Sequence, residues 1–232
     1  VEGSQAELVI TDASQRDKVD PLSQVRVLDV DDLLARAAQT EPLAEDVAIG
    51  GEGTLVQLYT SGTTGKPKGV PVPLRCLASF QSYLHYSLDV AADDVFWNAA
   101  DPGWAYGLYY AILAPLVAGR TSLLLNAGFT PDSTVEVLKR FKVTNFAAAP
   151  TIYRSLRAGA DVSGIRLRCA SSAGEPLTPE IVDWGLQMFG CEVRDHYGQT
   201  ELGMVIGNHW HPDVAQPLKP GSMGQVMPGY TA

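Results

Sequence analysis

The chain has 232 residues, of which 46% are hydrophobic and 19% charged, proportions that are ordinary for a globular protein. Its net charge of −9 excludes a general nucleic-acid-binding protein, which needs a basic surface to neutralise phosphates. The three cysteines, Cys76, Cys169 and Cys191, lie far apart in the sequence, which excludes a disulfide scaffold or a cysteine zinc site and indicates a reducing compartment.

Segments of strand and helix character alternate along the chain. In chain order we predict strand 7–12, strand 25–30, helix 32–39, strand 54–60, helix 76–90, strand 94–100, helix 106–118, strand 120–127, helix 131–141, strand 144–150, helix 151–159, strand 166–174, helix 179–190 and strand 192–198. Strands separated by helices of this length form βαβ units. The sequence therefore predicts an α/β fold with mainly parallel sheets flanked by helices.

Two local features refine these elements. We expect Asp31 and Asp32 to cap the helix 32–39, since carboxylates are favoured at the positive end of a helix dipole, and we prefer capping to a calcium site for them and for Asp29. Pro115 is expected to kink the apolar helix 106–118 or to end it early.

Residues 59–69, YTSGTTGKPKG, combine glycines, hydroxyls and lysines. A loop of the GxxxxGK[ST] type would need glycine and Ser or Thr where this chain has Thr60 and Pro67, and GxGxxG is absent too. Glycine amides, hydroxyl groups and lysine charges nevertheless suit a phosphate. The alternative is a flexible surface hairpin, because loops of this composition are common.

The order of residues favours the phosphate interpretation. YTSGTTGKPKG resembles the phosphate loop of the adenylate-forming superfamily, and four further segments resemble that family in its own order, closest to acetyl- and medium-chain acyl-CoA synthetases. They are AAPTIYR (148–154), SAGEPLTPE (172–180), DHYGQTE (195–201) and KPGSMGQVMPGY (219–230). The resemblance covers about residues 55–230.

This resemblance implies a two-step reaction. A carboxylate attacks the α-phosphate of ATP to give an acyl-adenylate and pyrophosphate, and the acyl group then passes to coenzyme A. ATP, Mg²⁺ and coenzyme A are the implied cofactors and co-substrates, and a short- or medium-chain fatty acid is the implied substrate. Chemistry of this kind depends mainly on positioning and on stabilisation of charge.

The resemblance also implies where ATP binds. The β- and γ-phosphates would contact Thr60, Ser61, Gly62, Thr63, Thr64, Gly65, Lys66 and Lys68. A backbone wall beside the adenine would come from Gly174, Glu175 and Pro176, and Tyr197 would stack on the adenine ring. The other implied ATP-binding residues of the acidic motif are Asp195, His196, Gly198, Gln199 and Thr200. We assign His196 no catalytic role.

Thr200 and Glu201 are the implied catalytic residues. Thr200 would contact the α-phosphate, and Glu201 would hold Mg²⁺, a cation that prefers oxygen ligands. The alternative for Glu201 is a solvated charge at the end of a strand. His209 and His211 could suggest a metal, but no third ligand is evident, so we assign them to a loop after the last strand.

Residues 101–104, DPGW, are similar to a segment beside the acyl pocket of acetyl- and medium-chain acyl-CoA synthetases. On that resemblance Trp104, Tyr106 and Gly107 would line the acyl pocket. The alternative for Trp104 is a place in the hydrophobic core. No carboxylate is evidently placed to receive a substrate ammonium group, which makes an amino-acid substrate the weaker expectation.

The chain departs from the family in two respects. After PKGV many relatives continue with a Thr-His or Ser-His pair, whereas this chain continues with residues 71–75, PVPLR, whose two prolines weaken the strand that follows the loop. The family's ribose-binding aspartate, hinge and C-terminal domain with its catalytic lysine would lie beyond Ala232, and an N-terminal segment is missing as well. We therefore expect residues 1–232 to be part of the large N-terminal AMP-binding domain and to adenylate poorly or not at all alone.

Two alternatives to a synthetase fragment stay open. One is a non-catalytic nucleotide-binding module, and the other is an amino-acid adenylation domain of a peptide synthetase. No apolar run approaches the roughly 18 residues of a membrane span. We expect the cytoplasm as the compartment, with the mitochondrial matrix as the alternative.

Overall fold

The structure is a computed structural model that describes the chain apart from residues 1–3, 20–24, 46, 62–66 and 232. Its largest part is a seven-stranded sheet in the order β11-β10-β9-β8-β7-β5-β6. The strands are β5 (Phe96–Asn98), β6 (Ser122–Leu123), β7 (Asn145–Ala148), β8 (Cys169–Ala173), β9 (Val193–Gln199), β10 (Gly203–Gly207) and β11 (Gln225–Val226). The five strands from β6 to β9 pair in parallel, whereas β10 and β11 continue the sheet antiparallel. The predicted α/β fold with a mainly parallel sheet is confirmed.

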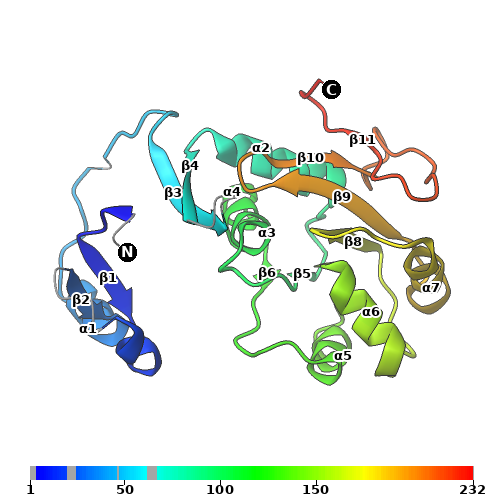
Figure 1. Ribbon diagram of the computed structural model, residues 1–232, viewed down its shortest axis with the longest axis horizontal. Coiled ribbons are helices and arrows are strands. Elements are labelled where there is room, and N and C mark those ends of the chain that lie inside the picture. The colour runs from blue at the N-terminus through cyan, green and yellow to red at the C-terminus, as the bar shows by residue number, and fades with distance from the viewer. Residues whose placement is uncertain (1–3, 20–24, 46, 62–66, 232) are drawn as a thin grey trace.

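Helical segments cover both faces of this sheet (Figure 1). They are α2 (Cys76–Ser82), the π-helical η3 (Tyr83–Ser87), α3 (Ala105–Gly107), the π-helical η4 (Leu108–Leu113), α4 (Ala114–Ala118), α5 (Pro131–Arg140), α6 (Pro150–Gly159) and α7 (Pro179–Phe189). Helices α5, α6 and α7 pack on one face and the segments from α2 to α4 on the other.

Strand β7 lies at the centre of the sheet and is buried on both faces. Phe146 and Ala148 point into the cluster with α5, α6 and α7, while Ala147 points into the opposite cluster with α2, η3 and η4. The side-chain alternation of a strand explains this division. A strand buried on both faces favours apolar residues on both of them, which is why the run FAAA is continuous rather than alternating. Buried Asn145, which begins β7, donates its side-chain amide to the Leu88 carbonyl oxygen.

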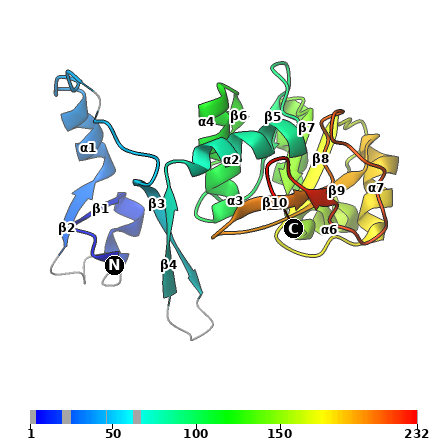
Figure 2. The ribbon, with the colours of Figure 1, turned by 90° about the horizontal axis from the view of Figure 1, so that it is seen from above.

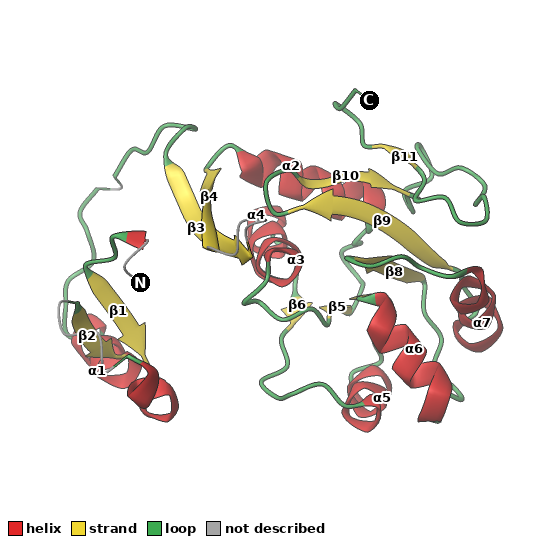
Figure 3. Cartoon of the chain, in the orientation of Figure 1, coloured by secondary structure: helices red, strands yellow, loops and turns green. Residues whose placement is uncertain are grey.

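Two smaller units precede the sheet (Figures 2 and 3). The first pairs β1 (Leu8–Thr11) in parallel with β2 (Arg26–Asp29), with the short 3₁₀ segment η2 (Ala13–Lys18) and helix α1 (Val30–Ala37) beside them. The second is an antiparallel hairpin of β3 (Thr54–Ser61) and β4 (Pro67–Pro73). The prolines of β4 are accommodated because this strand is the edge of a two-stranded ribbon, where an N–H can be missing without cost to a further neighbour.

Several elements differ from their predicted form. Asp29, and not Asp31 or Asp32, caps α1: its carboxylate accepts the Asp31 amide at 2.9 Å, while Asp31 and Asp32 lie in the first turn. The segment 120–127 pairs only at β6, because the chain beyond it lines a cavity instead of continuing in the sheet. Pro115 does not end the helix early: η4 continues directly into α4, which ends at Ala118, and the proline lies where the π-helical turns change to α-helix. None of the described helices is long and apolar enough to cross a membrane.

Candidate active site

The carboxyl ends of four parallel strands meet at one cavity of about 690 Å³. The chain leaves β5, β7, β8 and β9 through residues 99–101, 149, 174–175 and 200, and all of these line the cavity. Parallel strands bring their carboxyl ends to the same edge of a sheet, which is where ligands of open α/β sheets bind. Tyrosine rings of α3 and η4 form much of the remaining wall, together with Phe129, Ile152 and Met204.

Two of the three predicted acyl-pocket residues line this cavity. Trp104 is 73% exposed, so it does not belong to the core, and Tyr106 lies beside it. Gly107 is buried behind the wall: a Cβ atom there would lie 2.2 Å from the Asp101 carbonyl oxygen. Gly107 therefore allows the helix to approach the backbone after β5, and a direct contact with an acyl group stays a prediction for it.

Of the three residues predicted beside the adenine, two line the cavity and one does not. Gly174 and Glu175 line the cavity, whereas Pro176 is exposed outside the lining. Gly174 has φ +99°, a conformation that favours glycine at the sharp turn leaving β8. Glu175 pairs with Arg154 at 2.5 Å and accepts the Thr151 hydroxyl at 2.8 Å, and these bonds hold its pKa below the ordinary value.

The acidic motif places three of its residues in the cavity, whereas its first ones and Glu201 lie outside the lining. Gly198, Gln199 and Thr200 are lining residues. Tyr197 is half-buried on the strand and accepts a hydrogen bond from the Gln199 amide at 2.9 Å. Asp195 lines a different hollow, with residues of α7 and of the segment 218–222, and burial raises the pKa of its carboxyl to about 6.

His196 lies in the core rather than in the cavity. Its Nε2 is 3.2 Å from the Asn208 carbonyl oxygen, which can only accept, so Nε2 carries the proton and Nδ1 accepts the Tyr83 hydroxyl at 2.6 Å. The Tyr83 oxygen then accepts the Tyr106 hydroxyl at 3.2 Å. Burial lowers the pKa of His196 to about 3, so the ring is neutral and its contacts are structural.

Glu201 follows Thr200 in the turn after β9 and is exposed. Burial raises the pKa of the nearby Tyr109 to about 12, and the Glu201 charge adds to that rise. Among the residues that the structure describes, no group of three His, Cys, Asp or Glu side chains could hold a metal ion. A single carboxylate next to a threonine hydroxyl suits Mg²⁺ only where phosphate oxygens and water supply the other ligands.

The glycine-rich stretch is described only at its two ends. Gly62, Thr63, Thr64, Gly65 and Lys66 lie outside the described residues. Thr60 pairs with Lys68 across the β3–β4 hairpin, and Ser61 pairs with Pro67. The described residues of this hairpin do not line the cavity, so their contact with phosphates stays a prediction.

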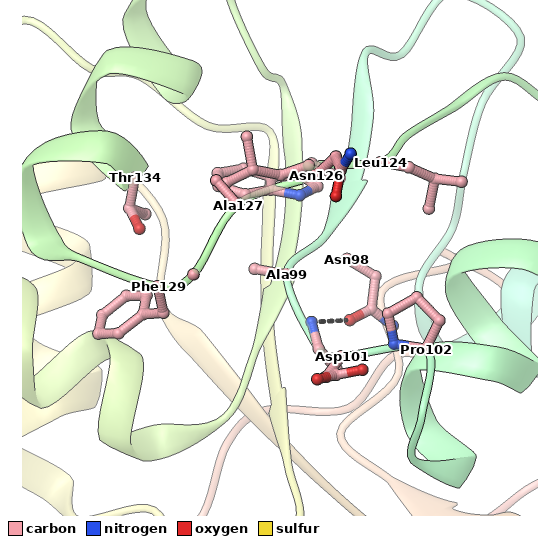
Figure 4. A pocket seen from close by; sticks show the side chains of 13 residues that line it. Asn98, Ala99, Asp101, Pro102, Leu124, Asn126, Ala127, Phe129 and Thr134 are labelled. Atoms are coloured by element: carbon pink, nitrogen blue, oxygen red, sulfur yellow. Dashed lines mark hydrogen bonds between the residues drawn. The ribbon is translucent and has the colours of Figure 1, made fainter. Parts of the chain in front are cut away.

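A second cavity of about 650 Å³ adjoins the first across residues 99–101 (Figure 4). Buried Asn98 holds this shared wall: its side-chain oxygen accepts the Ala100 amide at 3.0 Å, and its amide group donates to the Tyr106 carbonyl oxygen at 3.3 Å. Phe129 lines both cavities from the segment after β6. The wall position thus depends on Asn98 on one side and on Gly107 on the other.

Sequence reasoning missed several residues of the site. Tyr109, Tyr110 and Met204 line the cavity, and Arg154 holds Glu175. Strand β10 was assigned to no element, although the run of Met204, Val205 and Ile206 after a glycine is typical of a strand that follows a turn. Nothing in the sequence around Tyr109 and Tyr110 predicted more than an apolar helix.

Comparisons with known proteins agree with this geometry. The family model described as AMP-binding enzyme matches residues 1–232. A curated acetyl-coenzyme A synthetase of Bacillus subtilis is 36% identical over 180 residues, which are 75% of this chain and 31% of that protein.

Solved structures extend the likeness to nearly the whole chain. An acyl-CoA synthetase of Brucella canis has a TM-score of 0.89 at 41% identity, over 98% of this chain and 44% of that one. An ATP-bound MatB of Rhodopseudomonas palustris has a TM-score of 0.79 at 26% identity, over 96% of this chain and 45% of that one. The chain thus spans about a third of the curated relative and less than half of these solved chains.

Proposed function

The chain belongs to the AMP-binding enzyme family, and on that premise we propose that it is part of an ATP-dependent acyl-CoA synthetase. The enzyme would join a carboxylic acid to ATP, release pyrophosphate, and pass the acyl group to coenzyme A. The observation that carries the proposal is the cavity at the strand ends, since one space joins Trp104 and Tyr106 to Gly174, Glu175 and Thr200.

The roles of the residues follow from their places around this cavity. ATP would lie between the segment after β8 and the end of β9, with Thr200 at the α-phosphate and Glu201 at the Mg²⁺ ion. A Mg²⁺ ion held by Glu201 would supply positive charge against the charge that develops on the phosphates. The glycine-rich stretch 60–68 would cover the outer phosphates, and Tyr197 would stack on the adenine.

The apolar wall favours a short- or medium-chain fatty acid as the substrate. Trp104, Tyr106 and Tyr109 offer ring surface to an aliphatic chain, and their bulk limits its length. Two carboxylates line the cavity, and both have partners: Glu175 has Arg154, and Asp101 accepts the Gly103 amide at 2.7 Å. An amino acid would need a free carboxylate for its ammonium group, so this wall favours the fatty acid.

The complete reaction is proposed for the full-length protein, with coenzyme A as the second substrate and the cytoplasm as the compartment. The chain would be part of the large N-terminal domain, and a C-terminal domain with a catalytic lysine would complete the site. Residues 1–232 alone are then expected to adenylate poorly or not at all.

ATP–pyrophosphate exchange tests the proposal directly. The full-length protein and residues 1–232 are assayed in parallel with acetate, butyrate, octanoate, benzoate and amino acids. Exchange with one class of acid by the full-length protein, and its loss in the shorter chain, would support a synthetase. A folded protein that binds ATP but exchanges with no acid would refute it and leave a nucleotide-binding module.

Variants separate the two halves of the cavity. Glu201→Gln should raise the Mg²⁺ concentration needed for exchange, while Glu136→Gln, which removes a solvent-exposed carboxylate of α5, should not. Trp104→Ala should shift the preference toward longer acids because it enlarges the acyl side of the cavity. If Glu201→Gln left the Mg²⁺ requirement unchanged, Glu201 would be the solvated charge of the alternative reading.

A further inference from the structure

The turn that carries Thr200 and Glu201 has little support of its own. It is a β-turn in which the Leu202 amide donates to the Gln199 carbonyl oxygen at 3.2 Å, followed by Gly203 at φ +67°. This is the form of a hairpin whose turn is followed by a left-handed glycine. One internal hydrogen bond does not fix the orientation of the half-buried Thr200 and the exposed Glu201.

Two consecutive tyrosines bind this turn from across the cavity. The Tyr109 hydroxyl donates to the Thr200 carbonyl oxygen at 3.1 Å, and the Tyr110 oxygen accepts the Met204 amide at 2.8 Å. Both tyrosines belong to the π-helical η4, whose wider turn brings neighbouring side chains closer to one direction than an α-helix would. Single turns of π-helix are rare and are often found at functional sites.

Both tyrosine rings are packed against other aromatic rings. Tyr109 stacks on Phe80 with ring centroids 4.4 Å apart, and Tyr110 packs on Tyr83 at the same centroid separation. Gly203 fits closely against Tyr110, since a Cβ atom there would lie 2.9 Å from the tyrosine oxygen. The two hydroxyls therefore hold fixed points at both ends of the turn.

We propose that Tyr109 and Tyr110 are positioning residues that hold the turn of Thr200 and Glu201 in the geometry that binds nucleotide and metal. The proposal rests on the proposed function, which assigns the α-phosphate and Mg²⁺ to this turn. The same two side chains line the cavity with their rings. Their rings would face the acid, while their hydroxyls set the position of the turn.

Because the ring and the hydroxyl of each tyrosine have different contacts, their roles can be tested separately. Replacing either tyrosine by phenylalanine keeps the ring and removes only the hydroxyl, so the affinity for the acid should not change. The turn loses one hydrogen bond, and the Mg²⁺ concentration for half-maximal exchange should rise by about two- to tenfold, the range that corresponds to one neutral hydrogen bond. A variant with a general structural defect would change both the Mg²⁺ requirement and the affinity for the acid.

The experiment compares Tyr109→Phe, Tyr110→Phe and the matched control Tyr153→Phe in the full-length protein. Tyr153 is also fully buried, but its hydroxyl donates to the carbonyl oxygens of Phe146 and Ser171, away from the turn. Half-saturating Mg²⁺ and the KM for the acid are measured by ATP–pyrophosphate exchange. Amide hydrogen exchange of the peptide 199–205 is measured in the same proteins without substrate.

The proposal is supported if both cavity variants need more Mg²⁺, keep the KM for the acid and exchange the amides of the turn faster than the control. It is overturned if the turn exchanges at the control rate, or if it loosens and the Mg²⁺ requirement stays that of Tyr153→Phe. A wild-type protein that adenylates no acid would instead refute the proposed function. Amide exchange would still decide whether the two tyrosines hold the turn.

Discussion

Neutral His196 in the core makes the stability of the protein depend on pH in a way that one variant can isolate. The side chain is 2% exposed and its pKa is lowered by burial from 6.5 to about 3. Because the folded pKa lies below the unfolded one, the unfolded state takes up the proton first on acidification. The contribution of His196 to stability is thus present above pH 6.5 and lost as the pH falls toward 3.

The magnitude follows from linkage. Between pH 7 and about 4.5 these pKa values give a loss of about 2.5 kcal/mol in the free energy of unfolding. Asp195 acts in the opposite direction, because burial raises its pKa from 3.8 to about 6. Its protonation over the same interval returns about 2 kcal/mol. The contributions of His196 and Asp195 therefore largely cancel in the wild-type protein, although each residue alone would change its stability strongly.

Replacing His196 with glutamine isolates the contribution of His196 to the pH dependence of stability. Glutamine stays neutral at all pH values and offers an acceptor oxygen and a donor NH₂ group, which can replace the acceptor and donor nitrogens that the neutral imidazole presents to Tyr83 and Asn208. Urea unfolding followed by tryptophan fluorescence, at pH 7 and about 4.5, gives the free energy of unfolding of both proteins. The His196→Gln protein should gain about 2.5 kcal/mol relative to the wild type on acidification.

The comparison between the two proteins cancels every group that they share. Parallel dependence of the two stabilities on pH would refute the reasoning, because it would mean that His196 keeps an ordinary pKa in the folded state. The absolute cost of the substitution at pH 7 does not enter, since only the change with pH is compared.

Three further predictions concern the same part of the molecule. Asp195→Asn should raise the free energy of urea unfolding at pH 7 by up to about 3 kcal/mol, which is the equivalent of the pKa shift of Asp195. This gain should vanish as the pH falls from about 6 to 3.8, because the carboxyl of the folded wild type is then protonated. An unchanged stability at pH 7 would count against a buried charge at Asp195. Arg168→Ala removes the ion-pair partner of Asp94, whose side chain is 3% exposed, and should lower the free energy of unfolding by roughly 2 kcal/mol, a value reduced because Arg168 itself is part-exposed. A change near zero would show that the hydrogen bonds from Thr144 and Ala91 are sufficient for the Asp94 carboxylate. Gly107→Ala should displace the wall after β5 and lower ATP–pyrophosphate exchange in the full-length protein by roughly tenfold or more, whereas unchanged exchange would mean that this wall does not position the acid.

Part of the site could be predicted because its residues are close together in the sequence. The segments 172–180 and 195–201 each end a strand, and parallel strands must bring such ends to one edge of the sheet. Gly174, Glu175, Gly198, Gln199 and Thr200 accordingly share one cavity. The residue types of the acidic motif and the order of the motifs can also be read directly from the sequence.

Other properties depend on contacts between residues far apart in the chain. Trp104 could be core or cavity from its sequence, and only the packing of α3 and η4 leaves it exposed. The π-helical turn that points Tyr109 and Tyr110 at one hairpin could not be predicted from local propensity. An apolar helical sequence is compatible with both α- and π-helical hydrogen bonding, and the sequence does not distinguish the two.

The sequence by itself determined the class of fold and the identity of the reactive groups. Alternation of apolar strands with helices leaves few architectures other than a mainly parallel sheet covered on both faces, since each apolar face must be buried. The tertiary structure decided which groups are neutral, which are exposed and which hold others in place. His196 is an example: its tautomer and lowered pKa come from burial against Tyr83 and Asn208, and no local pattern encodes a contact with a residue 113 positions away.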